Sequence, residues 1–99
     1  MRLSKRLVAA AKRRAFPLSP RSPRGATKIV EVALRFCIGA RLDGQTGPQI
    51  YARWMWLFRH AYTGCMRPDC WSCESEVAKH QRIILGVLEV VAELERPGP

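Results

Sequence analysis

Apolar residues recur every three or four positions along most of this chain, and that spacing constrains the fold more than any other feature. A turn is indicated by the Asp-Gly and Thr-Gly pairs between residues 42 and 47. No segment shows the apolar-polar alternation of a half-exposed strand, although the β-branched stretch from Ile83 to Val91 keeps a strand as an alternative there. The spacing predicts three helices: Thr27 to about Ala40, about Pro48 to Tyr62, and about Glu74 to Arg96.

The charge of the chain is concentrated at one end. Residues 1 to 28 contain nine lysines and arginines and no acidic residue, whereas the rest of the chain contains eight of each sign. The net charge of +9 therefore belongs to the N-terminal region. A basic segment attached to a neutral body is typical of proteins that bind polyanions, because phosphates attract the cations and release their own counterions on binding. The expected contacts are Arg2, Lys5, Arg6, Lys12, Arg13, Arg14, Arg21 and Arg24.

The N-terminal region is predicted to be a flexible arm. Residues 3 to 16 have a weakly amphipathic helical spacing, which we expect to become ordered only on binding. The following sequence PLSPRSPRG, from Pro17 to Gly25, contains three prolines and is typical of an extended linker. We therefore divide the chain into an arm, residues 1–25, and a helical body, residues 26–99, and we expect the body to stay folded when the arm is deleted.

A body of this size buries a core that gives marginal stability, so a further stabilising element is expected. The N-terminus has no signal-peptide core, so we expect reduced cysteines in a protein that is not secreted. Cys65, Cys70 and Cys73 lie within nine residues of a predicted cysteine-rich loop at 65–73. A CxxC pair places two sulfurs on one centre and the loop can return a third, so this spacing predicts a structural zinc site. The alternative is three ordinary cysteines.

A tetrahedral zinc site needs a fourth ligand, for which the sequence offers three candidates. His60 is the preferred one, because it precedes Cys65 by five residues near the end of a predicted helix. His80 follows Cys73 by seven residues, and in one helix the two would be about 10 Å apart along the axis, too far for a shared ion. Cys37 would need a tertiary contact, and the usual role of such a cysteine is in the core.

Aromatic residues are concentrated in the second predicted helix and the loop that follows it. On that helix Tyr51, Trp54, Met55, Phe58 and Tyr62 share one face, which we assign to the core. Trp56 lies on the other face with Arg53 and Arg59. A tryptophan among cations can stack on unpaired bases while the arginines contact phosphates. The alternative is that Trp56 packs against a neighbouring helix.

The sequence therefore predicts an all-α, non-enzymatic and regulatory nucleic-acid-binding protein, with RNA or single-stranded nucleic acid as the favoured ligand. No paired carboxylates, activated nucleophile or phosphate-binding glycine loop is present, and no small-molecule substrate is expected. A cytoplasmic or nuclear location is expected. The alternative is a protein-interaction module whose N-terminal helix is a mitochondrial or nuclear address, or binds an anionic membrane surface.

Overall fold

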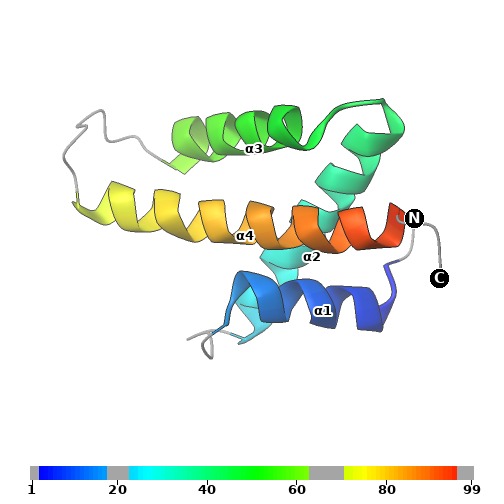
Figure 1. Cartoon of the computed structure of the whole chain (residues 1–99). Coiled ribbons are helices and arrows are strands. Elements are labelled where there is room, and N and C mark those ends of the chain that lie inside the picture. The colour runs from blue at the N-terminus through cyan, green and yellow to red at the C-terminus, as the bar shows by residue number, and fades with distance from the viewer. Residues whose placement is uncertain (1–2, 18–22, 63–70, 96–99) are drawn as a thin grey trace.

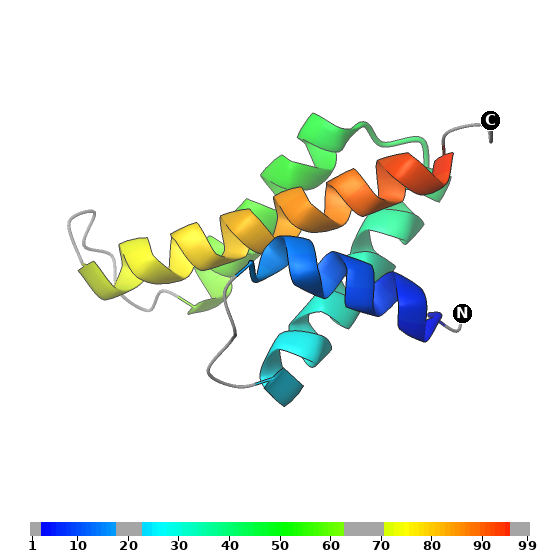
Figure 2. The same cartoon turned by 60° about the horizontal axis from the view of Figure 1, so that its bottom comes forward.

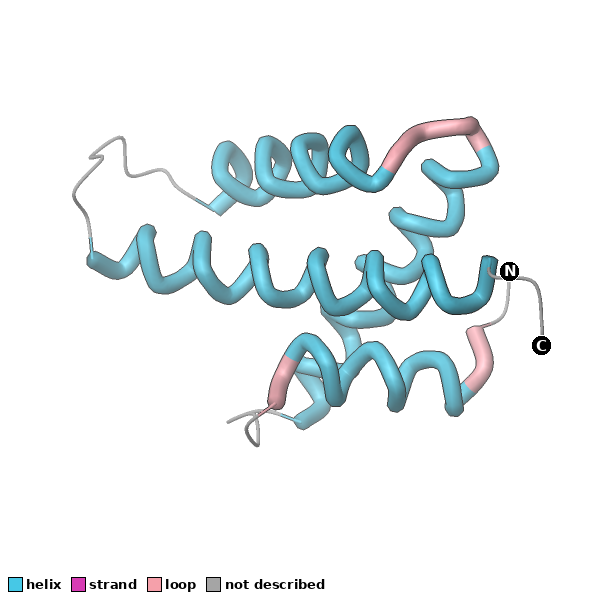
Figure 3. The backbone as a smooth tube through the Cα atoms, in the orientation of Figure 1, coloured by secondary structure: helices cyan, strands magenta, loops and turns pink. Residues whose placement is uncertain are grey.

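The computed structural model describes residues 3–17, 23–62 and 71–95, with side chains for 3–17, 24–58 and 77–95. These residues form helices and short connections, with no strand among them (Figure 3). The all-α prediction is confirmed, and the stretch from Ile83 to Val91 is helical. There are four helices: α1 at Lys5–Ala15, α2 at Pro23–Leu42, α3 at Gly47–Tyr62 and α4 at Trp71–Glu95.

The prediction of three helices and a flexible arm is wrong, because α1 packs against α2 and α4. Val8, Ala11 and Ala15 are buried on one face of α1, at spacings of three and four residues. Leu3, Leu7 and Phe16 pack around them, half-buried. The hydrophobic signal of this segment is weak because two of the three buried residues are alanines. Deleting the segment would uncover the core, so its loss is expected to destabilise the rest of the chain.

Helix α4 is central to the fold. It contacts all three other helices, with α1 and α3 on opposite sides of it and α2 crossing behind (Figures 1 and 2). Its buried face is therefore wide, and a single core is shared by all four helices. The fully buried side chains with the largest volumes are Trp54, Leu34, Ile50, Ile83, Ile84, Val30, Val87 and Cys37.

Small residues allow α1 to approach α4 closely. A Cβ atom placed on Gly86 of α4 would lie 2.9 Å from the backbone nitrogen of Ala15 and 3.1 Å from the carbonyl carbon of Arg14. Real Cβ atoms do not come this close to backbone, so no larger residue fits without displacing α1. Glycine lowers the intrinsic helix propensity at this position, and the close contact between the two helices offsets that loss.

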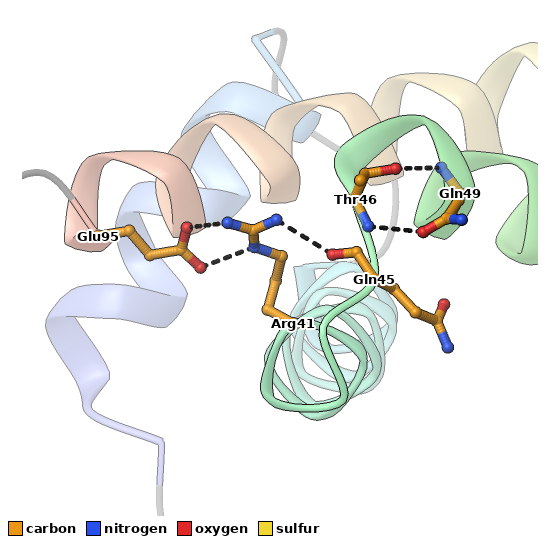
Figure 4. A network of polar contacts seen from close by, with 5 residues as sticks. All are labelled: Arg41, Gln45, Thr46, Gln49 and Glu95. Carbon is orange, nitrogen blue, oxygen red and sulfur yellow. Dashed lines mark hydrogen bonds and ion pairs between the residues drawn. The ribbon is translucent and has the colours of Figure 1, made fainter.

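Side-chain caps fix where two of the helices begin. The hydroxyl of Ser4 accepts a hydrogen bond from the backbone N–H of Leu7 at the start of α1. At the start of α3, the amide oxygen of Gln49 accepts from the N–H of Thr46 at 2.9 Å, and the Thr46 hydroxyl accepts from the N–H of Gln49 (Figure 4). This reciprocal pair is a capping box, and it makes Thr46 the cap rather than Gly47.

The turn between α2 and α3 is also held to the end of α4. Gly44 in this turn has a φ of 82°, a conformation that glycine adopts without strain. The guanidinium of Arg41 donates to the carboxylate of Glu95 and to the carbonyl oxygen of Gln45 (Figure 4). The hydrogen bond and charge of each partner raise the pKa of Arg41 and lower the pKa of Glu95. The C-terminal ends of α2 and α4 therefore meet.

Two predicted boundaries differ from the structure. The last residues of the expected linker, Pro23 to Gly25, belong to α2, while residues 18–22 lie outside the described residues. Helix α4 begins at Trp71 rather than Glu74, so Cys73 lies in a helix and not in a loop. The core face of α2 is formed by Val30, Ala33, Leu34 and Cys37, whereas Val32 is 52% exposed.

Candidate nucleic-acid interface

The outward face of α1 is basic. Arg6 and Arg13 are exposed and lie opposite the buried Val8, Ala11 and Ala15. The first turn of α1 has no acidic residue, and none occurs elsewhere in the helix. Ala9 is exposed between the two arginines, so no large side chain separates them. This face of α1 therefore presents positive charge to any polyanion that approaches it.

Arg14, a predicted phosphate contact, forms ion pairs with carboxylates of the same chain. One of its terminal nitrogens lies 3.5 Å from a carboxylate oxygen of Glu89, and the other donates to Glu93. Both carboxylates belong to α4, so this arginine ties α1 to α4. It is the one cation of α1 for which the structure gives an ion pair among the described residues.

The other predicted cations are distributed along the first half of the chain. Lys5 and Arg24 are exposed, and Lys12 is half-buried. Arg2 and Arg21 lie outside the described residues. Two further exposed cations, Lys28 and Arg35, share the outward face of α2 and were not in the predicted set. Their spacing of four and eleven residues after Arg24 was the signal that could have found them.

Trp56 lies on the outward face of α3. It is 61% exposed, whereas Trp54, two residues earlier, is 1% exposed. The predicted core face is confirmed for the described side chains: Trp54 is buried, and Tyr51, Met55 and Phe58 pack against the core. Ile50, which was not in the predicted set, is also buried. Arg53 is exposed, with its guanidinium carbon 6.0 Å from the centroid of the Phe36 ring on α2. The side chain of Arg59 lies outside the described part.

The two halves of the predicted interface are not adjacent. The cations of α1 and the tryptophan of α3 are on helices that α4 separates, as both views show (Figures 1 and 2). Each set points away from the shared core. A ligand that contacts one of these surfaces therefore does not contact the other unless it passes around the molecule.

All four predicted zinc ligands lie where the structure gives no side-chain description. Cys65 and Cys70 are outside the described residues, and for His60 in α3 and Cys73 in α4 the backbone alone is described. Among the described residues there is no group of three metal-binding side chains. Helices α3 and α4 pack together, and the end of α3 and the start of α4 lie at the same end of the bundle (Figure 1). The metal site stays a prediction.

The two alternative fourth ligands belong to the core. His80 is 3% exposed, and its ring stacks on Phe58 with centroids 4.0 Å apart. It shares α4 with Cys73, which is the arrangement that places the two side chains too far apart along the axis. Cys37 is fully buried in α2, and burial raises the pKa of its thiol to about 12. Its side chain packs among the apolar residues of the shared core.

Comparison with known proteins assigns the chain to no family and gives it no function. No protein-family model matches the chain, and no curated protein or solved structure is detectably similar to it. None of the described helices is long and apolar enough to cross a membrane. The support for the candidate interface therefore comes from the exposed cations and the exposed Trp56 alone.

Proposed function

We propose that this protein is a non-enzymatic, regulatory nucleic-acid-binding protein that contacts phosphates through α1, with RNA or single-stranded nucleic acid as its favoured ligand. The observation that carries the proposal is the outward face of an acid-free helix, where Arg6 and Arg13 are exposed. Such cations displace the counterions of a nucleic acid, and this release drives binding.

The packing of α1 supports this proposal over a removable address or a membrane helix. Val8, Ala11 and Ala15 belong to the core, so cleavage of α1 would uncover apolar surface of α2 and α4. A helix that enters a membrane surface buries its apolar face in lipid. In α1 that face is covered by the protein, and the basic face is the one presented outward.

The test compares two double variants that remove the same amount of charge. Arg6→Ala/Arg13→Ala removes the outward cations of α1, while Lys79→Ala/Arg82→Ala removes two cations of α4. Binding to an unpaired oligonucleotide is measured by filter retention over a range of salt concentrations. We expect the α1 variant to reduce the slope of log K against log salt by about 1.4, because each phosphate neutralised on a single strand contributes about 0.7. We expect the α4 variant to retain the original slope.

An equal reduction in both variants would mean that overall charge, rather than α1, determines binding, and would contradict the proposed interface. Both variants alter residues that take no part in an ion pair described in this structure. Their melting temperatures should match that of the unaltered protein, which separates a loss of binding from a loss of folding.

A structural zinc ion held by Cys65, Cys70, Cys73 and His60 is the second part of the proposal. It is supported by the ligand spacing and by the placement of His60 and Cys73 on two helices that pack together. A metal at this position would join the end of α3 to the start of α4. The proposed set leaves out Cys37, because its side chain packs among apolar residues of the shared core.

Metal analysis tests this part. We expect protein purified under reducing conditions to contain about one zinc per chain, and Cys70→Ser to lose the zinc and melt at a lower temperature. Cys37→Ala is the control, since it removes a cysteine from the core and should keep the zinc. Unchanged melting of Cys70→Ser and of chelator-treated protein would remove the metal from the proposal.

A further inference from the structure

The outward face of α2 connects the two separate parts of the candidate interface. Arg24, Lys28 and Arg35 are exposed on one side of this helix, opposite the buried Val30 and Cys37. Residues four and eleven positions apart on a helix lie within about 40° of one line, so the three cations form a stripe. From Arg24 to Arg35 the stripe is about 16 Å long, at 1.5 Å per residue.

Helix α2 runs from the side of the molecule that holds α1 to the side that holds α3. It begins beside α1, passes behind α4, and ends at the turn that leads into α3 (Figures 1 and 2). Its outward face therefore forms a route between α1 and α3 that does not cross α4.

At the α1 end, cations continue the stripe. Arg14 lies on the edge of α1 that faces the carboxylates of α4. Lys5 and Lys12 are seven residues apart and share the opposite edge, because Lys12 and Arg14 differ by about 200° around the helix. Since α1 rests on α4 and α2, this second edge is the one on the side of α2.

At the α3 end, the stripe meets an arginine and then an exposed aromatic ring. Phe36 follows Arg35 directly, and the guanidinium of Arg53 lies over its ring. On α3, Trp56 is 61% exposed, and one turn before it the exposed residue is the small Ala52. Helix α3 contains no acidic residue.

We propose that single-stranded nucleic acid follows this route: cations of α1 and α2 contact its phosphates, and Trp56 stacks on an unpaired base. The inference rests on the proposed function and adds the path and the selection for unpaired strands. The stripe on α2 is about as long as five stacked nucleotides at about 3.4 Å each. A bound strand must be longer than that to reach both Lys12 and Trp56.

The charges of α4 favour this route over the opposite one. Glu89 and Glu93 are exposed on α4 beside α1, and a strand that crossed from α1 over α4 would meet these two carboxylates, which share the single cation Arg14. On α2 one acid lies within the stripe: the half-buried Glu31 is about one turn from both Lys28 and Arg35, so the described stripe carries three cations and one carboxylate. The net positive charge of the α2 stripe therefore attracts phosphates more strongly than the two carboxylates and one arginine where α1 meets α4.

The first experiment compares an oligothymidylate of about 20 nucleotides with a duplex of the same length. We expect Trp56→Ala to weaken binding of the single strand about tenfold, the effect of removing one base-stacking platform. Duplex binding should change less than twofold, because its bases are paired. Trp56→Phe retains an aromatic ring and should restore most of the single-strand affinity. An equal effect on both ligands, or none on the single strand, would overturn the stacking assignment.

The second experiment tests whether the path is continuous. Lys28→Ala removes the middle of the stripe and should lower the salt slope for the single strand by about 0.7. Lys79→Ala on α4 is the matched control and should leave it unchanged. An effect of Trp56→Ala without any effect of Lys28→Ala would overturn the path while leaving the proposed function intact. If the unaltered protein binds neither ligand, the proposed function itself fails, and the path fails with it.

Discussion

Helices α1 and α3 occupy equivalent places on either side of α4, and neither contains an acidic residue, yet they are attached by different means. Helix α1 approaches through Ala11, Ala15 and Gly86, with little apolar area on each side chain. Helix α3 is held by large rings: Trp54 and Phe58 lie 4.2 Å apart by centroid, and Phe58 stacks on His80 of α4.

This contrast explains how each helix can expose its candidate binding residues without losing its attachment to α4. An aromatic cluster removes much apolar area from water, so α3 can present a second tryptophan outward without depending on it for stability. Helix α1, whose buried residues are small, is attached to α4 by close contact and by the ion pairs of Arg14. Its cations Arg6 and Arg13 take no part in this attachment and point outward. Stability and candidate binding groups are therefore on opposite faces in both helices.

The largest effect is expected from the attachment of α3. Trp54→Ala should lower the free energy of unfolding by about 3–5 kcal/mol, because it leaves a cavity in the aromatic cluster. Trp56→Ala, two residues away on the exposed face, should change it by less than about 0.5 kcal/mol. Urea unfolding followed by circular dichroism measures both. Similar decreases in the two variants would show that the outward face of α3 is also structural.

An intermediate effect is expected where α1 meets α4. Gly86→Ala should lower the free energy of unfolding by about 1–3 kcal/mol, since its Cβ would overlap the backbone at Ala15. Gly39 in α2 is the matched control: a Cβ there meets nothing within 4 Å. Gly39→Ala should therefore raise stability by about 0.5–1 kcal/mol, the usual gain from replacing glycine in a helix. Stabilisation by both substitutions would contradict the close contact of α1 with α4.

The smallest effect is expected from the ion pairs of α1. Arg14→Ala should lower stability by about 0.2–1 kcal/mol, because the guanidinium and both carboxylates are partly exposed. A double-mutant cycle with Glu93→Ala isolates the interaction, and its coupling should decrease as salt is added. A coupling that salt does not change would mean that the pair is shielded from solvent, unlike the one described.

The helical periodicity of the sequence identified three of the four helices and the core face of α3. It also placed Trp56 outward, because large apolar residues at regular spacing define a helix face clearly. The first helix was mistaken for a flexible arm. Its buried positions include Ala11 and Ala15, whose small side chains carry little hydrophobic signal, and nothing in the sequence showed that Gly86 lies opposite them.

The helical class, the acid-free N-terminal region and the spacing of the cysteines follow from the sequence alone. Tertiary packing was needed to show that α1 belongs to the core, that Arg14 is bound to Glu89 and Glu93, and that Lys28 and Arg35 lie on a face between α1 and α3. The sequence and the tertiary structure show different things, because the spacing of apolar residues predicts only which face of a single helix is buried. Close approach, ion pairing and the continuity of a surface depend on which helices become neighbours, and that is a property of the packed molecule.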